Sequence, residues 1–453
     1  MTKYRWIICA LLFFATTVNY LDRQVFSLLQ PVLTDIYKWT NSDYANITSA
    51  FTFMYAVFTL LVGRYVDNLG TKKGYALAIT VWSLGACIHA FVYYVEPESK
   101  MTFLGFAMPV SVFAFMICRA VLALGEAGNF PAAIKTVAEW FPKKERSLAT
   151  GIFNSGANIG AIVAPLLVPV IAKYWGWQWA FVAVGAIGFL WLIFWFSYYG
   201  SPKEMLAKGK INNEEFQHIN SDEEQEKTKD DPEENDSDKK KVSWFSLLGY
   251  RQTWSFTMGK FLTDGVWWFF LFWMPSYLKN NYGMTTEDMM LPLAVLYSMT
   301  MFGSIGGGYL PKIFQKDGRD PYKSRMRAML TIAIFPLVVL LAQPLSDISY
   351  WLPVILIGIG CSAHQAWSAN IYTTVSDMFP KKTVASIVGI GTMAGSLSGV
   401  ITSKIGGWLF DYYSAQGSIE TGYTIMFVFC AIAYLLGWTV MKLLVPKYKI
   451  IEL

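Results

Sequence analysis

Long apolar segments follow one another along almost the whole chain. Each is long enough, at about 20 residues or more, for a helix to cross a hydrocarbon core of roughly 30 Å. They fall into two groups of six, which predicts an all-α polytopic membrane protein with twelve transmembrane helices. The predicted spans are residues 5–30, 46–68, 74–95, 103–138, 147–173, 178–199, 252–280, 288–313, 326–345, 350–378, 383–410 and 422–444.

A polar stretch separates the two groups of spans. Residues 200–243 contain thirteen acids and eight bases, a composition that predicts a flexible, solvated linker. The expected domains are an N-terminal six-helix bundle over residues 1–199, an acidic cytoplasmic linker over 200–245 and a C-terminal six-helix bundle over 246–453. The linker has a net charge of −5 and the rest of the chain +10, so the mild basicity belongs to the membrane body.

Composition supports this class of protein and argues against others. Of the 453 residues, 54% are hydrophobic and only 15% are charged, and the mean hydropathy is +0.36, which no soluble globular class matches. The bases form no continuous stripe, so nucleic acid is not an expected partner. The five cysteines lie in apolar segments without ligand spacing, which indicates packing residues and no disulfide or metal site. The sequence contains no nucleophile elbow or phosphate loop, and we expect neither an enzyme nor a cofactor.

Positive charge in the short loops predicts the orientation in the membrane. By the positive-inside rule, the side richer in bases is cytoplasmic, and both termini and the linker lie there. The first apolar run is long enough to span and lacks the cleavage site of a signal peptide. The bases on the predicted cytoplasmic side are Lys3, Arg5, Arg64, Lys72, Lys73, Lys143, Lys144, Arg146, Lys312, Lys316, Arg319, Arg325, Arg327, Lys381, Lys382, Lys442, Lys447 and Lys449, whereas Lys38, Lys100, Lys173 and Lys279 lie on the other.

An internal repeat relates the two groups of spans. The repeated residues are Phe141-Pro142-Lys143-Lys144 with Gly151-Ile152, and Phe379-Pro380-Lys381-Lys382 with Gly389-Ile390, at a constant offset of 238 residues. Two halves of equal topology joined by a soluble loop resemble the parallel repeat of a major facilitator transporter. The resemblance implies a substrate site between the halves near the midplane, and alternating access by rocking of the two bundles.

The loop between the second and third spans resembles the signature of the same superfamily. Residues 63–73 read G-R-Y-V-D-N-L-G-T-K-K, which fits the pattern G-x-x-x-D-x-x-G-x-K-K. Gly63 permits close helix approach, Gly70 permits a tight turn, and Asp67 can accept hydrogen bonds from a neighbouring helix end or base. Asn68 stands where a base is often found. The alternative is an ordinary cytoplasmic turn with positive-inside charge.

The candidate chemistry lies in the first and fourth predicted spans, which contain Asp22 with Arg23 and Arg119 with Glu126 respectively. A charge at the centre of a spanning helix costs about 2.5 to 3.5 kcal/mol, so such residues usually face a cavity, a partner or a substrate. Arg119 and Glu126, seven residues apart, share one helix face at a separation of about 10 Å. Asp22 and Arg23 are consecutive and point in different directions, which leaves Arg23 available for bidentate binding of a substrate carboxylate.

Proton coupling is the function that buried carboxyl groups suggest. The pKa of such a group depends on burial and on neighbouring charge, so Asp22 and Glu126 could load a proton from one side and release it to the other. Arg119 is the expected tuner of Glu126. The alternative is a fixed ion-pair network that holds the first and fourth spans together.

Three local sequences resemble bacterial hexuronate transporters of the anion:cation symporter family. They are Asn19-Tyr20-Leu21-Asp22-Arg23-Gln24, Arg119 with Gly125-Glu126-Ala127-Gly128-Asn129-Phe130-Pro131, and Ala363-His364-Gln365-Ala366-Trp367-Ser368-Ala369-Asn370. The resemblance covers nearly the whole chain except the linker. In related galactonate symporters, the acids matching Asp22 and Glu126 carry protons, the arginines matching Arg23 and Arg119 serve conformational coupling and pKa control, and the tyrosine matching Tyr55 contacts substrate. The resemblance implies the same roles here.

The second half is expected to supply most contacts to a sugar. Imidazole, amide and hydroxyl groups can satisfy sugar hydroxyls, and an aromatic face can cover the apolar side of a pyranose. The alternative for these polar residues is hydrogen bonding between helices, with the tryptophan as packing. Lys260 is a further candidate, although Asp264 four residues later favours a neutralising salt bridge. The predicted substrate contacts of this half are Lys260, His364, Gln365, Trp367, Ser368 and Asn370.

These observations predict a proton-coupled importer of a hexuronate or similar sugar acid in a bacterial inner membrane, acting as a monomer and driven by the proton gradient. A symporter of another small organic anion, such as an aldonate or aromatic acid, is the first alternative. A membrane sensor that binds substrate without moving it is the second. Uptake into proteoliposomes separates all three.

Overall fold

The computed structural model describes residues 2–103, 105–221, 244–315, 321–447, 449 and 451. For some residues near the helix ends within these ranges, the structure describes the backbone alone. Gly63, Arg64, Asp67, Lys143 and Lys144 are among them. The predicted hydrogen bonding of Asp67 therefore lies outside the described residues. The predicted turn at Gly70 is confirmed. Gly70 lies between two helices with a φ of 76°, a conformation that glycine adopts readily.

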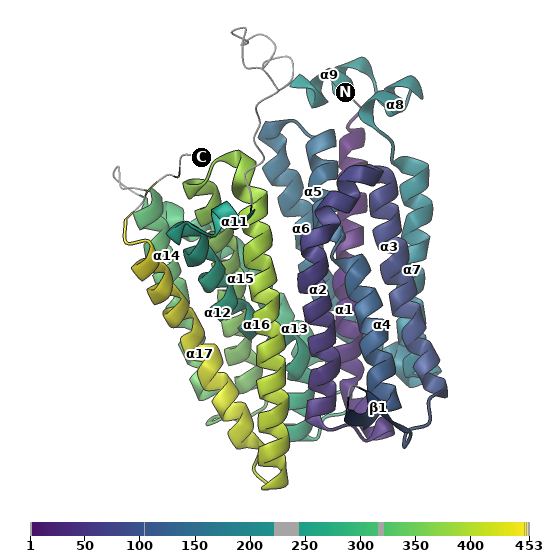
Figure 1. Ribbon diagram of the computed structural model, residues 1–453, viewed down its shortest axis with the longest axis vertical. Helices are drawn as coiled ribbons and strands as arrows, with labels where there is room; N and C mark the ends of the chain where they lie inside the picture. Colours follow the sequence, from purple (N-terminus) through teal and green to yellow (C-terminus); the bar gives the residue numbers. More distant parts are fainter. Residues whose placement is uncertain are drawn as a thin grey trace.

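The N-terminal half consists of six long helical segments and a small hairpin (Figure 1). The third and fourth segments are each built from two shorter helices. In chain order the elements are α1 (Tyr4–Tyr37), α2 (Asn41–Leu69), α3 (Thr71–Ile88), η1 (His89–Tyr94), β1 (Lys100–Phe103), β2 (Phe106–Pro109), α4 (Val110–Glu126), α5 (Asn129–Trp140), α6 (Lys143–Trp175), α7 (Trp177–Tyr198), α8 (Pro202–Ala207) and α9 (Asn213–Ile219). Strands β1 and β2 pair antiparallel.

The C-terminal half repeats this plan without the hairpin. Its elements are α11 (Trp244–Leu247), α12 (Arg251–Tyr282), α13 (Met290–Phe314), α14 (Pro321–Ile334), η3 (Phe335–Leu341), α15 (Trp351–Met378), α16 (Lys381–Ala415) and α17 (Ile419–Leu444). The two halves form two bundles side by side, with both chain ends, α8, α9 and α11 at one end and the β1–β2 hairpin at the other (Figure 1). We call these ends the terminal face and the hairpin face.

The prediction of twelve spanning helices in two groups of six is confirmed. Among the described residues, eleven helices are long and apolar enough to cross a membrane. The twelfth, α12, has 32 residues but is more polar, because Lys260 and Asp264 lie near its middle. Such a charged pair within a span marks a position that faces protein.

The fourth span breaks between α4 and α5, in the stretch that contains Gly125, Gly128 and Pro131. Pro131 has no N–H to donate to the carbonyl of Ala127, so the regular bonding cannot continue through this point. A Cβ on Gly125 would lie 2.3 Å from the backbone nitrogen of Trp82, so glycine is needed for α3 to pack this closely. Glu126 is therefore the last residue of α4, held at a helix end inside the bundle.

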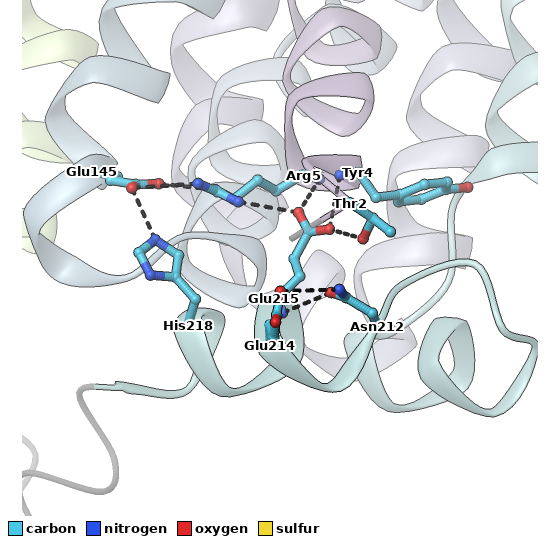
Figure 2. A network of polar contacts seen from close by, with 8 residues as sticks. All are labelled: Thr2, Tyr4, Arg5, Glu145, Asn212, Glu214, Glu215 and His218. Atoms are coloured by element: carbon cyan, nitrogen blue, oxygen red, sulfur yellow. Dashed lines mark hydrogen bonds and ion pairs between the residues drawn. The ribbon is translucent and has the colours of Figure 1, made fainter.

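The first part of the predicted linker is ordered and packs against the N-terminal bundle. Figure 2 shows Glu215 of α9 below the first turn of α1. Its Oε2 accepts a hydrogen bond from the backbone N–H of Tyr4 at 3.0 Å, and its Oε1 accepts from the backbone N–H and Nη1 of Arg5 at 3.2 and 3.1 Å. Glu215 thus caps α1, whose first N–H groups have no partners within the helix.

A second carboxylate extends this contact to α6. Arg5 Nε donates to Glu145 Oε2 at 2.9 Å, and His218 Nε2 lies 2.9 Å from Glu145 Oε1 (Figure 2). The prediction of a flexible, solvated linker over residues 200–243 is therefore wrong for α9, since polar contacts fix α9 to α1 and α6. Residues 222–243, which hold most of the acids, lie outside the described residues.

The two bundles contact one another most extensively through α1 with α12, α2 with α16 and α6 with α13. The polar contacts between bundles that we describe lie from the middle of the membrane to the hairpin face. They include Tyr44 Oη donating to the Phe272 carbonyl at 2.8 Å and Lys279 Nζ to Asp35 Oδ2 at 2.6 Å. The structure thus has the bundles closed together at the hairpin face.

Candidate functional site

Asp22 and Arg23 lie near the middle of the 34-residue helix α1 and are almost completely buried, with 2% and 3% of their surface exposed. Their surroundings differ, because Arg23 has a carboxylate partner whereas Asp22 Oδ2 has no hydrogen-bond partner among the described residues. Arg23 donates from Nε and Nη2 to Glu126 Oε2 at 3.0 and 2.8 Å. This ion pair joins α1 to the end of α4 inside the N-terminal bundle.

Among the described residues, Glu126 accepts hydrogen bonds from Arg23 and none from Arg119, although the Arg119 charge also acts on Glu126 electrostatically. The role of Arg119 as the tuner of Glu126 stays a prediction. Arg119 and Glu126 share a helix face but lie two turns apart, about 10 Å, which is too far for direct contact. Arg23 reaches Glu126 from the neighbouring helix. The prediction that Arg23 is free to meet a substrate is consequently not met in this conformation, in which Glu126 occupies it.

Four aromatic rings surround the Arg23 guanidinium. Its carbon lies 4.8 Å from the ring centre of Tyr20, 4.9 Å from Tyr55, 5.5 Å from Phe51 and 5.4 Å from Trp268. We call these rings the aromatic box. Three belong to α1 and α2, but Trp268 comes from α12 in the other bundle, so the cation lies at the boundary between bundles. Cations are stabilised over aromatic faces at such distances.

Several polar atoms near this pair have no hydrogen-bond partner among the described residues. They belong to Asp22, Asn19, Glu126 and Arg119, whose three guanidinium nitrogens are all without a partner. Arg119 is fully buried and lies 4.2 Å above the ring of Phe51. A buried polar group without a partner costs about 1 to 3 kcal/mol, and more if it is charged. The site therefore retains hydrogen-bonding capacity that water, a proton or a bound molecule could use.

The C-terminal bundle contributes one buried ion pair facing this region. Lys260 Nζ lies 2.6 Å from Asp264 Oδ2 and donates to the Tyr372 hydroxyl at 3.0 Å. Tyr372 in turn lies close to Tyr20 and Tyr55 of the other bundle. The predicted salt bridge of Lys260 is thus confirmed, and the pair lies next to the aromatic box.

The remaining predicted residues of α15 have different surroundings. His364 stacks on Trp267 at 5.1 Å and its Nδ1 lies 2.9 Å from the Tyr434 hydroxyl. Trp367 is fully buried against Tyr434, with ring centres 5.7 Å apart. Gln365 and Ser368 are half-buried.

Asn370 is the clearest case of the alternative interpretation. Its Nδ2 donates to the carbonyls of Gly307 on α13 and Ala366 on α15, at 2.7 and 2.9 Å. Asn370 therefore joins two helices of one bundle. Its predicted contact with substrate would have to use Oδ1, which has no partner among the described residues.

Sequence reasoning missed Phe51 and Tyr372 as members of the site. Phe51 lies in an apolar run of the second span, where an aromatic residue has no distinguishing local signal. Tyr372 lies two residues beyond the stretch 363–370 that was singled out, and its position as the partner of Lys260 follows only from the packing of α12 against α15.

Comparisons with known proteins agree with this architecture. The family model described as Major Facilitator Superfamily matches residues 12–403. The hexuronate transporter of Escherichia coli (strain K12) is 30% identical over 97% of this chain and 94% of its own length. The galacturonate transporter of Dickeya chrysanthemi is 30% identical over 69% of this chain and 83% of its own length.

A solved structure shows the same fold. The crystal structure of a D-xylose-proton symporter superposes with a TM-score of 0.72 at 13% sequence identity, covering 98% of this chain and all of that one. At this identity the likeness concerns the fold alone. The family match spans most of the chain and both bundles, and the relatives are transporters and not enzymes. The chain belongs to the Major Facilitator Superfamily.

Proposed function

We propose that this protein imports a hexuronate or a related sugar acid together with protons, by alternating access of a site between its two bundles. The observation that carries the proposal is the buried Arg23–Glu126 pair inside the aromatic box at the bundle boundary. The names of the hexuronate and galacturonate relatives support the substrate class.

Competition for Arg23 provides the coupling. Arg23 can pair with Glu126 or with a substrate carboxylate, because a single guanidinium fork binds one carboxylate in a bidentate manner. Protonation of Glu126 removes its charge and releases Arg23 to the substrate. Loss of that proton on the other side restores the pair and expels the substrate. Asp22 and Arg119, which have polar atoms without partners in the described part of the chain, serve as the second proton acceptor and as the fixed charge that sets the balance.

The aromatic box and the opposite bundle hold the sugar. Tyr55 and Trp268 offer flat apolar faces for a pyranose ring, and Lys260, His364, Gln365 and Ser368 offer polar groups for its hydroxyls. Trp367 and Asn370 contribute less directly, because each already packs or bonds within the C-terminal bundle.

Orientation follows from the loop charges. We take the terminal face to be cytoplasmic in a bacterial inner membrane, since the short loops there hold most of the bases. With this orientation, the described polar contacts between the bundles run from the middle of the membrane to the side away from the cytoplasm, which supports a conformation closed on that side. A cysteine added at the C-terminus of the protein tests this orientation. In intact cells it should not react with an impermeant reagent, and it should react once the membrane is broken.

Uptake into proteoliposomes tests the function. With a pH gradient, acid outside, labelled glucuronate should accumulate, and unlabelled galacturonate should compete more strongly than an aldonate or an aromatic acid. Glu126→Gln should abolish proton-driven accumulation while sparing substrate exchange. Accumulation that survives collapse of the gradient would contradict proton coupling, and competition by aromatic acids alone would contradict the substrate class.

A further inference from the structure

At the hairpin face, one carboxylate of the C-terminal bundle binds the start of a helix in the other. Asp411 lies near the end of α16, and its Oδ1 accepts hydrogen bonds from the backbone N–H and the side-chain amide of Asn41, at 2.8 and 3.0 Å. Its Oδ2 accepts from the backbone N–H of Ser42 at 2.8 Å. Three donors of α2 thus converge on one carboxylate across the boundary between bundles.

The first turn of α2 depends on this contact to satisfy its backbone. Thr40 and Asp43 form a capping box, in which the Thr40 hydroxyl accepts from the Asp43 N–H at 3.0 Å. That cap leaves the N–H groups of Asn41 and Ser42, and these are the two that Asp411 accepts. The cap of α2 is therefore divided between the two bundles, and only the half supplied by Asp411 must break when they separate.

Gly407, one turn before Asp411, allows the helices to come this close. A Cβ at this position would lie 2.6 Å from the Cβ of Ala45 and 2.8 Å from the carbonyl oxygen of Asn41. The α16 sequence thus combines a close-approach glycine with a capping acid on the same helix face, one turn apart.

Other ionic contacts between the bundles at this face are weaker anchors. Lys173 and Glu287 are 2.5 Å apart, but their side chains are 50% and 44% exposed, so water screens the pair. Lys279 reaches Asp35, whose side chain is 69% exposed. Asp411 is half-buried and binds a helix N-terminus, where charge-assisted bonds and the helix dipole act together.

We propose that Asp411 is the latch that closes the hairpin face, and that breaking its cap on α2 sets the ease with which the protein opens to that side. Asp411 is a positioning residue in this role, since it acts through the placement of α2. The inference rests on the alternating access of the proposed function but not on its substrate or its coupling ion.

A cysteine reporter measures the opening. Ser49 of α2 is 4% exposed and its hydroxyl contacts the Val400 carbonyl of α16 at 3.4 Å, so Ser49→Cys places a nearly isosteric thiol in the closed interface. In intact cells or oriented vesicles, its rate of reaction with an impermeant maleimide reports how often the hairpin face opens. In the Ser49→Cys background, Asp411→Ala should raise this rate roughly tenfold, and Asp411→Asn by less, because it keeps one acceptor.

A second variant removes the same contact from the other bundle. Asn41 is the first residue of α2, where proline is favoured, and Thr40 before it is already extended, with φ −76° and ψ 165°. Asn41→Pro deletes both donors of Asn41 without breaking the helix and should raise labelling by a similar factor. Combined with Asp411→Ala it should add little, since the two act on one contact. Asn41→Ala, which keeps the backbone donor, should have the smaller effect.

Controls separate a latch from general loosening. The five native cysteines lie buried or half-buried within the bundles, so labelling of the parent without Ser49→Cys must stay the same in every variant. Lys173→Gln should change the reporter rate by less than about twofold. Unchanged labelling in both Asp411→Ala and Asn41→Pro, or equal increases at the native cysteines, would overturn the latch. The assay uses neither substrate nor a pH gradient, so failure of the uptake experiment leaves its result intact.

Discussion

The two bundles contain buried charge in different states. In the C-terminal bundle, Lys260 is fully engaged with Asp264 and Tyr372. In the middle of the N-terminal bundle Arg23 and Glu126 are paired, whereas Asp22 and Arg119 keep polar atoms without partners among the described residues. A buried ion pair with all its hydrogen bonds made gains nothing from a new partner. An unpaired buried polar group, in contrast, is stabilised when it binds a proton, water or a ligand. This difference supports the proposed proton coupling in the N-terminal bundle and a fixed charge pattern in the other.

The largest expected effect comes from breaking the paired charges of the N-terminal bundle. Arg23→Gln leaves Glu126 buried and uncompensated, which costs about 3 to 5 kcal/mol for a buried pair. We expect uptake to fall at least about 100-fold and thermal stability to drop. Arg23→Gln combined with Glu126→Gln removes both charges and should recover the thermal stability but not the uptake. Recovery of uptake in the double variant would show that the pair is only a structural lock.

The same design applied to the C-terminal bundle tests the other side of the comparison. Lys260→Met leaves Asp264 alone in a mostly buried position and should lower the free energy of unfolding by roughly 3 kcal/mol. Adding Asp264→Asn should restore most of it in a thermal unfolding assay. Uptake by the stable double variant then decides the role of Lys260. We expect it to stay low, with a raised KM, because Lys260 is a proposed substrate contact, and normal uptake would reduce it to a structural residue.

The link between the bundles at Arg23 gives a smaller effect. Trp268→Phe weakens one face of the aromatic box and should raise the KM for uptake about threefold, since cation–π contacts contribute roughly 0.5 to 2 kcal/mol. Trp273→Phe is the matched control. Trp273 also lies on α12 and contacts Tyr44 across the boundary, at 5.0 Å between ring centres, but has no cation beside it. Equal effects of the two variants would assign the loss to aromatic packing between bundles.

The fold was predictable from sequence because each span carries its own signal. Hydropathy marks the spans, and the break at Glu126 follows from Gly125, Gly128 and Pro131, whose effects are local. The pairing of Arg23 with Glu126 was not predictable, because it depends on how α1 packs against the end of α4 and on how far the Arg23 side chain extends. The burial of Glu215 was hidden for a similar reason: an acid-rich segment reads as solvated unless the cap it supplies to α1 is known.

The pH dependence of the α9 contact gives the smallest expected effect. Burial alone would raise the pKa of Glu215, but hydrogen bonds from Thr2, from the N–H groups of Tyr4 and Arg5 and from the Arg5 side chain hold it below the ordinary value of about 4.3. A carboxyl with a lowered pKa in the folded state stabilises the protein at pH values above its unfolded pKa, and this contribution is lost as pH falls through the folded pKa.

Glu215→Gln should therefore lower the free energy of unfolding by about 1 kcal/mol at pH 7 and make little difference in strong acid, where the wild-type carboxyl is protonated as well. Thermal unfolding from pH 7 down to 3 measures this. Glu98→Gln is the control, because Glu98 is an exposed acid of the loop before β1 and takes no part in the α9 contact. A pH-independent loss in Glu215→Gln would mean that the shape of the side chain, and not its charge, fixes α9 to the bundle.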